Sequence, residues 1–125
     1  MIIGVGTDLC EISRMAGLLQ DTAFLKRYFD PREQAYILSK GVFAASAMAG
    51  IFAAKEAFVK ALRKGFDGIR PEDILVLHRE GGAPYYELQG SAQSEAKKQL
   101  VTKSHLSISH EGGLAVAFCV LEGGL

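Results

Sequence analysis

The chain has 125 residues and a mass of 13.5 kDa, with 49% hydrophobic and 22% charged residues, which is the size and apolar content of one compact domain over residues 1–125. Lysine plus arginine equals aspartate plus glutamate at 14 each, so no overall field attracts nucleic acid or an anionic membrane. The longest uncharged apolar stretch, residues 42–54, is well short of the ~20 residues that a membrane span needs, and a buried helix explains it better.

The N-terminus predicts a cytoplasmic location, and the two cysteines predict no disulfide or zinc site. Residues 1–8 lack the basic segment and the long apolar stretch of a signal peptide. Cys10 and Cys119 are too few and too far apart for a disulfide framework or a zinc-binding spacing. We therefore expect two reduced, buried thiols without a function.

The first segment predicts a strand that carries a carboxylate. Residues 2–9 are apolar and β-branched with interspersed glycines, which predicts a buried strand with Asp8 at its C-terminal end. Residues 11–19 fit a short helix, with Ile12 and Met15 on its apolar side and Arg14 nearer to solvent.

Two helices are expected in the middle of the chain. Asp30 fits an N-cap with Pro31 at the first helical position and Glu33 three residues beyond the cap, which predicts a helix over residues 31–39. A longer, alanine-rich helix should occupy residues 43–64, because basic residues and then a glycine stand at its end in the order expected of a helix C-terminus.

The second half of the chain changes to strand patterns. Residues 74–77 and 85–88 are strand-like and are separated by a glycine- and proline-containing connection, which predicts a hairpin. A polar helix is expected over residues 91–100. Residues 106–110 alternate with period two and should pair with the apolar residues 114–121 as a second hairpin. The pattern predicts a single-domain α+β fold, with an antiparallel sheet packed around a long central helix.

Glu56 and Lys60 form a charged pair inside the apolar helix. They are four residues apart and share one face, and such a pair is most often a weak surface ion pair. A helix this apolar should be largely buried, however, and a buried charged pair must be matched by a partner or a ligand. If the strand that ends at Asp8 docks on this helix, Asp8 and Glu56 could converge on one Mg²⁺ while Lys60 faces a substrate phosphate. Taken alone, Asp8 fits a capping or strand-end aspartate.

Other polar residues carry less information by themselves. His105 and His110 flank a short strand with two serines, and each is more often a structural histidine than a ligand. The glycines within residues 3–6 do not open a dinucleotide-binding fingerprint, and the sequence has no Walker loop or zincin motif. Those enzyme classes are therefore disfavoured.

Three segments together resemble the bacterial holo-[acyl-carrier-protein] synthases, the small group of the 4′-phosphopantetheinyl transferases. They are Ile-Gly-Val-Gly-Thr-Asp-Leu at residues 3–9, Phe-Ala-Ala-Lys-Glu-Ala-Phe-Val-Lys-Ala at residues 52–61 and Leu-Ser-Ile-Ser-His at residues 106–110. They occur in the family's order and spacing, and the match covers essentially the whole chain. The resemblance implies transfer of phosphopantetheine from coenzyme A to a serine of an acyl carrier protein, in fatty acid biosynthesis, with release of adenosine 3′,5′-bisphosphate.

The resemblance also implies roles for individual residues. Asp8 and Glu56 are similar to the family's magnesium ligands, and Lys60 to the lysine near the pyrophosphate of coenzyme A. These three residues are the expected catalytic set. His105 is similar to the histidine that lies beside bound coenzyme A, and Lys64 is a further candidate contact to this substrate. The proton of the carrier serine could pass to Glu56 through a water, to a metal-bound water or to Asp8.

The family is known as a homotrimer with active sites between subunits, so residues 32–51 of one chain are expected to complete the site of the next. Relatives commonly carry arginine where this chain has Ile51, and that position is associated with the phosphates of coenzyme A. Lys40, Arg63 and Lys64 are the candidates to replace it.

Arg14 matches a basic position that the family uses against its acidic carrier protein. Two other interpretations of the chain stay open. One is a catalytically silent module that binds coenzyme A or a nucleotide, which the neutral Ile51 supports. The other is a structural α+β oligomer in which the apolar helix forms a subunit contact.

Overall fold

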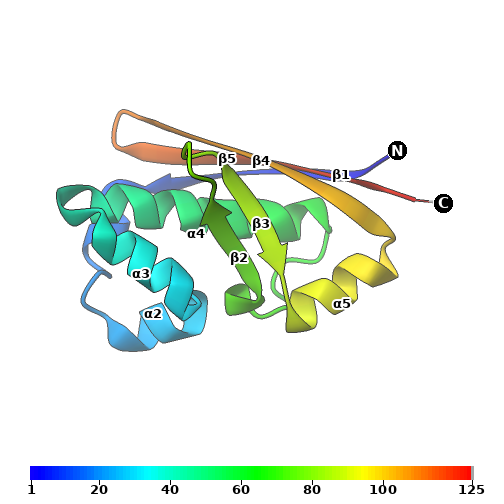
Figure 1. Cartoon of the computed structure of the whole chain (residues 1–125), viewed down its shortest axis with the longest axis horizontal. Helices are drawn as coiled ribbons and strands as arrows, with labels where there is room; N and C mark the ends of the chain where they lie inside the picture. The colour runs from blue at the N-terminus through cyan, green and yellow to red at the C-terminus, as the bar shows by residue number, and fades with distance from the viewer. Residues whose placement is uncertain (125) are drawn as a thin grey trace.

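A long helix lies along one face of a three-stranded sheet and forms the centre of the molecule (Figure 1). The structure is a computed structural model, and it describes residues 1–124. In chain order the elements are β1 (Ile2–Glu11), α1 (Ile12–Ala16), α2 (Thr22–Tyr28), α3 (Pro31–Ser39), α4 (Ala44–Ala61), β2 (Ile74–His78), β3 (Pro84–Leu88), α5 (Gly90–Lys98), β4 (Val101–Glu111) and β5 (Leu114–Gly123), with 3₁₀ turns at Gly41–Phe43 and Pro71–Asp73. The predicted α+β fold is confirmed.

Both predicted hairpins are present, in two separate antiparallel sheets. The larger sheet has the order β1-β5-β4, so β1 and β4 are its edges, and β2 and β3 form the smaller sheet. Asp8 on β1 lies opposite Ala117 on β5, which in turn lies opposite Ile108 on β4. Figure 1 shows the small sheet crossing α4 on the side away from the large sheet, with α2 and α3 near one end of α4 and α5 near the other.

The sequence predictions for the N-terminal region are wrong in three respects. The first strand continues to Glu11, so Asp8 lies within β1 rather than at its end. The strand is also not buried on both faces, because α4 covers only one of them and buried and exposed residues alternate along it. The helix expected over residues 11–19 is confined to Ile12–Ala16, and α2 was not predicted.

Two glycines bring the backbones of β1 and α4 into direct contact. A Cβ atom on Gly4 would lie 1.9 Å from the carbonyl oxygen of Ala61, and one on Gly6 would lie 1.9 Å from that of Ala57. Side chains two residues apart in a strand share a face, so Asp8 points toward α4 with these glycines. The contact therefore places a carboxylate beside the helix.

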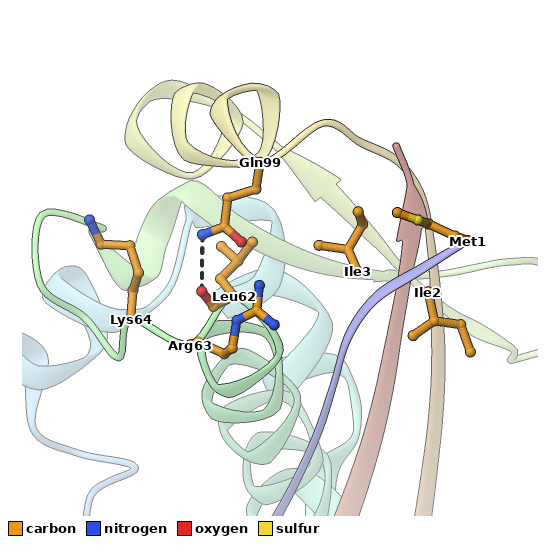
Figure 2. A pocket seen from close by; sticks show the side chains of 7 residues that line it. All are labelled: Met1, Ile2, Ile3, Leu62, Arg63, Lys64 and Gln99. Carbon is orange, nitrogen blue, oxygen red and sulfur yellow. Dashed lines mark hydrogen bonds between the residues drawn. The ribbon is translucent and has the colours of Figure 1, made fainter. Parts of the chain in front are cut away.

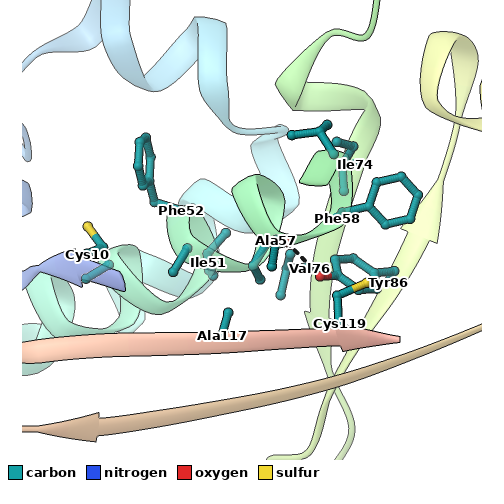
Figure 3. Packing of buried hydrophobic residues seen from close by; sticks show 14 of the residues in the cluster. Cys10, Ile51, Phe52, Ala57, Phe58, Ile74, Val76, Tyr86, Ala117 and Cys119 are labelled. Atoms are coloured by element: carbon teal, nitrogen blue, oxygen red, sulfur yellow. Dashed lines mark hydrogen bonds between the residues drawn. The ribbon is translucent and has the colours of Figure 1, made fainter. Parts of the chain in front are cut away.

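Helix α4 is the core helix of the protein. The segment Gly41–Ala61 has the length and apolar composition of a membrane span, but 67% of its most apolar stretch is buried inside the protein. Alternate β5 residues pack against it, namely the fully buried Ala115, Ala117, Cys119 and Leu121. Tyr86 of β3 donates a 2.6 Å hydrogen bond to the Ala54 carbonyl of α4, and its ring lies beside Cys119 of β5 (Figure 3). The predicted burial of both cysteine thiols is confirmed.

A fully buried ion pair joins α3, α4 and β2. Lys55 and Glu33 are both 0% exposed, and the Lys55 amine lies 2.7 Å from Glu33 Oε1. Lys55 also donates to the carbonyls of Pro71 (2.9 Å) and Ile74 (2.8 Å), so all three of its hydrogens have acceptors. Burial raises the pKa of Glu33 and lowers the pKa of Lys55, and the charge of each partner opposes the effect of burial on the other.

Glu33 also satisfies backbone groups at two places. Its carboxylate accepts the amide of Asp30 (2.9 Å) in the capping box of α3 and the amide of Val76 (2.8 Å) on β2. The predicted N-cap at Asp30 is therefore confirmed, but no sequence pattern indicated that the capping glutamate also binds Lys55. One side chain holds a helix start, a strand and the central helix together.

The backbone contact predicts a large cost for a single methyl group at Gly6. Gly6→Ala should lower the free energy of unfolding by about 3 kcal/mol or more, because strand and helix must separate to admit the Cβ atom. Gly81→Ala is the matched control, since no atom lies within 4 Å of its Cβ position. Urea denaturation measures both changes, and equal stabilities of the two variants would contradict the proposed backbone contact.

The buried pair predicts that the loss of Lys55 destabilises the protein far more than the loss of a cation from a surface ion pair. Lys55→Met should lower the free energy of unfolding by about 3–5 kcal/mol, because it leaves the buried Glu33 carboxylate without its cation. Arg32→Met breaks the exposed ion pair with Glu87 and should cost far less. Thermal or urea unfolding of both variants makes the comparison, and a Lys55→Met protein as stable as Arg32→Met would show that the pair is not needed.

Candidate active site

The structure brings Asp8 and Lys60 into contact at the free edge of β1. Lys60 Nζ lies 3.1 Å from Asp8 Oδ1 and donates a second hydrogen bond, 3.0 Å long, to the Thr7 carbonyl. Side chains on a helix lean toward its N-terminus, so Lys60 extends back along α4 toward Asp8. The Lys60 side chain is 54% exposed and the Asp8 side chain 18%, so the pair is open to a ligand.

Glu56 lies one helical turn before Lys60, and the charges of Asp8 and Lys60 both shift its pKa. Burial raises the pKa of Glu56, and the negative charge of Asp8 raises it further. The positive charges of Lys60 and Arg14 lower the pKa of Glu56 and so act in the opposite direction. The Glu56 carboxylate therefore lies near the Asp8 carboxylate and near the cations of Lys60 and Arg14. The structure brings Asp8 and Lys60 into contact, and it places Glu56 near enough for both charges to act on it.

Arg14 of α1 lies near enough to Glu56 for its positive charge to lower the pKa of that carboxyl group. Its guanidinium carbon lies 5.1 Å above the centre of the Phe52 ring, which fixes it against α4. The sequence placed Arg14 near solvent and did not connect it with Glu56. Because Arg14 and Glu56 belong to different segments, no spacing rule joins them, and only the packing of α1 on α4 does so.

A pocket of about 470 Å³ surrounds the edge of β1 at Asp8. Asp8 and Lys60 line it from the helix side, and Thr7, Leu9 and Val116 line it from the other face of the sheet. The site is therefore a shallow depression that wraps around a sheet edge and is open to both faces.

The donor set fits Mg²⁺ better than a transition metal. Two carboxylates repel each other across the site, and hard oxygen ligands of this kind suit Mg²⁺, which also keeps waters and binds substrate phosphates. Within residues 1–124 no group of three or more histidine, cysteine, aspartate or glutamate side chains converges, so the part of the chain that the structure describes contains no preformed all-protein metal cage. Asp8 and Glu56 are the residues that would hold the ion.

His105 lies on the opposite face of the large sheet from Asp8. It pairs with Val120, which pairs with Val5, and Val5 points away from α4. Its Nε2 atom contacts Glu122 Oε1 at 2.6 Å. The structure of one chain therefore does not bring His105 to the carboxylates.

The candidate replacements for a basic residue at position 51 lie apart from one another. Lys40 rests over the ring of Tyr36, with its amine 4.7 Å from the ring centre. Lys64 Nζ lies 3.5 Å from Glu95 Oε1 and lines a second pocket together with Arg63. Ile51 itself is 1% exposed. None of these cations contacts Asp8 or Lys60 within the described chain.

Comparisons with known proteins identify the family of this chain. Residues 4–119 match the 4′-phosphopantetheinyl transferase superfamily. The holo-[acyl-carrier-protein] synthase of Treponema denticola is 43% identical over 123 residues, which cover 98% of this chain and 100% of that protein. The enzyme of the same name from Trichlorobacter lovleyi is 46% identical over 125 residues, which cover 98% of each. The chain belongs to the 4′-phosphopantetheinyl transferase superfamily.

Solved structures extend the likeness to the whole fold. The holo-[acyl-carrier-protein] synthase of Neisseria meningitidis superposes with a TM-score of 0.88 at 31% identity, over 98% of this chain and 99% of that one. The Helicobacter pylori synthase in complex with coenzyme A superposes with a TM-score of 0.81 at 29% identity, over 94% of this chain and 99% of that one. The resemblance that the three sequence segments indicated is confirmed.

The facing carboxylates predict opposite pKa changes in two variants. Asp8→Asn removes a negative charge and should lower the pKa of Glu56, whereas Lys60→Met removes a positive charge and should raise it. Carbon-detected NMR titration of the glutamate carboxyl groups in metal-free protein measures both. An unchanged Glu56 pKa in Asp8→Asn would show that the carboxylates do not share a site.

Proposed function

We propose that this protein transfers the 4′-phosphopantetheine group of coenzyme A to a serine of an apo-acyl carrier protein and releases adenosine 3′,5′-bisphosphate. The observation that carries the proposal is the meeting of Asp8, Glu56 and Lys60 at the edge of β1, in a chain of this superfamily. Proteins named holo-[acyl-carrier-protein] synthase match over nearly its full length, and coenzyme A is bound in a related solved structure.

The reaction is a phosphoryl transfer. The serine oxygen of the carrier forms a bond to the β-phosphorus of coenzyme A, the bond from that phosphorus to the bridging oxygen breaks, and the bisphosphate leaves with the bridging oxygen. Charge neutralisation and positioning supply most of the catalysis in such reactions. Lys60 places a positive charge next to Asp8, where the diphosphate would lie, and Asp8 and Glu56 are the carboxylates near enough to accept the serine proton.

Magnesium dependence belongs to the same proposal. Asp8 and Glu56 would hold Mg²⁺, which offsets the negative charge of the diphosphate when it is bound. Burial and, second to it, the negative charge of Asp8 raise the pKa of Glu56, and the repulsion between the two carboxylates supports a cation between them. Arg14 and Lys60 would then limit the negative charge that the ion meets and keep the site selective for a substrate that brings its own phosphates.

We also propose a homotrimer with the site between subunits. The face of the large sheet away from α4 is unusually apolar, with Val5 55%, Leu9 63% and Phe118 48% exposed. That face reaches the rim of the pocket at Asp8, so a subunit packed on it would border the site. Lys60, Lys64 and His105 remain the proposed contacts to coenzyme A, with His105 acting across the subunit contact.

A cytoplasmic location follows from the same proposal. Coenzyme A and acyl carrier proteins of fatty acid biosynthesis are the substrate and partner, and neither nucleic acid nor a membrane is required. The equal numbers of acidic and basic residues and the burial of α4 in the core support this proposal.

The function is tested by the mass of a purified apo-acyl carrier protein after incubation with this protein, coenzyme A and Mg²⁺. The carrier should gain one phosphopantetheine, and chelation of the metal should abolish the gain. Asp8→Ala and Glu56→Ala should each reduce turnover by about 100-fold or more while melting like the wild type, because they remove charge from the site and not from the core.

Glu11→Ala is the matched control, since Glu11 is an exposed carboxylate on the same strand and should leave turnover unchanged. Near-native turnover of either site variant would refute the metal site. If several carrier proteins stayed unmodified while coenzyme A still bound, the chain would be a silent binding module instead.

A further inference from the structure

Tyr28, the last residue of α2, packs beside the part of α4 that carries Glu56. Its ring stacks on the ring of Phe52, with 5.1 Å between the ring centres and 27° between the planes. Phe52 stands one helical turn before Glu56, and side chains on a helix lean toward its N-terminus, so the Glu56 side chain extends back toward this stack. Tyr28 also contacts Phe66, from the segment after α4, with 6.0 Å between the ring centres. The two contacts fix the ring against the helix near Glu56.

The hydroxyl of Tyr28 lies in the electrostatic neighbourhood of Glu56. Burial raises the pKa of Tyr28, and the negative charge of Glu56 raises it further. The positive charges of Arg14 and Arg27 lower the same pKa and so act in the opposite direction. Arg14 and Tyr28 also rest against the same ring, that of Phe52. The phenol, the Arg14 guanidinium and the carboxylate therefore lie close to one another on this side of α4.

The Glu56 carboxylate and the Tyr28 hydroxyl both lack a hydrogen-bond partner in the chain from residue 1 to residue 124. Asp8 differs, because Lys60 donates to its Oδ1 atom. A carboxylate that binds a metal ion is normally held in place by a further hydrogen bond, and loss of that bond typically weakens metal binding or activity about 10–100-fold. In the proposed metal site, Glu56 therefore needs a donor.

Tyr28 is the side chain best suited to be this donor. Lys60 already uses two of its three hydrogens on atoms of β1. Arg63 and Lys64 line a separate pocket at the end of α4, to which Glu56 does not contribute (Figure 2). A neutral hydroxyl also suits the role better than the cation of Arg14, because it leaves the full negative charge of the carboxylate to the metal ion.

We propose that Tyr28 is a positioning residue for Glu56, and that its hydroxyl donates a hydrogen bond that holds the Glu56 carboxylate in the orientation that binds Mg²⁺. This inference rests on the proposed function, because it concerns the proposed metal site. A carboxylate has two oxygens, so Glu56 can face the ion with one and accept the hydroxyl hydrogen with the other. The aromatic contacts fix the ring, while the hydroxyl hydrogen rotates freely toward its acceptor.

Tyr28→Phe removes the hydroxyl and keeps the aromatic stack, so this variant should melt like the wild type. The Mg²⁺ concentration that gives half-maximal turnover should rise about tenfold, while turnover at saturating Mg²⁺ stays within about twofold. Mn²⁺ binding followed by electron paramagnetic resonance, without coenzyme A or carrier, should weaken by the same factor. Tyr85→Phe is the matched control, since Tyr85 lies on β3 next to the inward-facing Tyr86 and points away from α4. It should change neither quantity.

Tyr28→Leu separates the hydroxyl from the packing of the ring, because it removes both. If Tyr28→Phe binds Mn²⁺ like the wild type and only Tyr28→Leu binds it more weakly, Tyr28 serves packing alone and the proposal is overturned. A melting temperature of Tyr28→Phe that falls together with the Mn²⁺ affinity overturns it as well, since the fold would then be the cause.

The metal measurements also keep this inference distinct from the transferase function. A wild-type response of Tyr28→Phe to Mg²⁺, in a protein that modifies its carrier, overturns the inference while the function stands. A wild-type protein that modifies no carrier, but whose Mn²⁺ affinity depends on the Tyr28 hydroxyl, overturns the function and retains the metal site with its positioning residue.

Discussion

The backbone contact between β1 and α4 at Gly4 and Gly6 is the constraint on which the rest of the structure depends. Without side chains at these two positions, the strand can lie directly against the carbonyl groups of the helix. The next residue on that face is Asp8, which therefore meets side chains of the last turns of α4 rather than solvent. A larger residue at either glycine would push the strand away and separate Asp8 from Lys60. The same two glycines thus determine both the core packing and the position of the site.

The buried pair of Glu33 and Lys55 acts on the opposite side of α4. Lys55 immediately precedes Glu56, so the pair holds the helix turn on which one of the two site carboxylates stands. Burying two charges is expensive, and their interaction alone would barely offset it. Both side chains also form hydrogen bonds with backbone groups. Removing either charge would therefore leave backbone groups of α3 or β2 without hydrogen-bond partners. The pair therefore fixes how these elements meet, and its contribution is to geometry more than to stability.

Sequence patterns predicted what depends on local order. The capping box at Asp30, the alanine-rich helix and both hairpins follow from capping and periodicity rules, and all are present. The convergence of Asp8, Glu56 and Lys60 needed the additional assumption that strand and helix dock. Contacts between distant segments had no local signal, as with Glu33 and Lys55, or Arg14 and Glu56. The sequence did predict that Gly4, Gly6 and Asp8 share a face, because residues two apart in a strand point to the same side of the sheet.

Because the proposed site lies on an edge strand, the proposed trimer would place a second subunit beside it. An edge strand leaves one row of backbone groups unpaired, and here Lys60 occupies one of them at the Thr7 carbonyl. The depression around Asp8 opens to the apolar outer face, where Leu9 and Phe118 are exposed and His105 also lies. A site enclosed by a single domain would need none of these surfaces. In the proposed trimer, a second subunit packed on this apolar face would cover the strand edge beside Asp8.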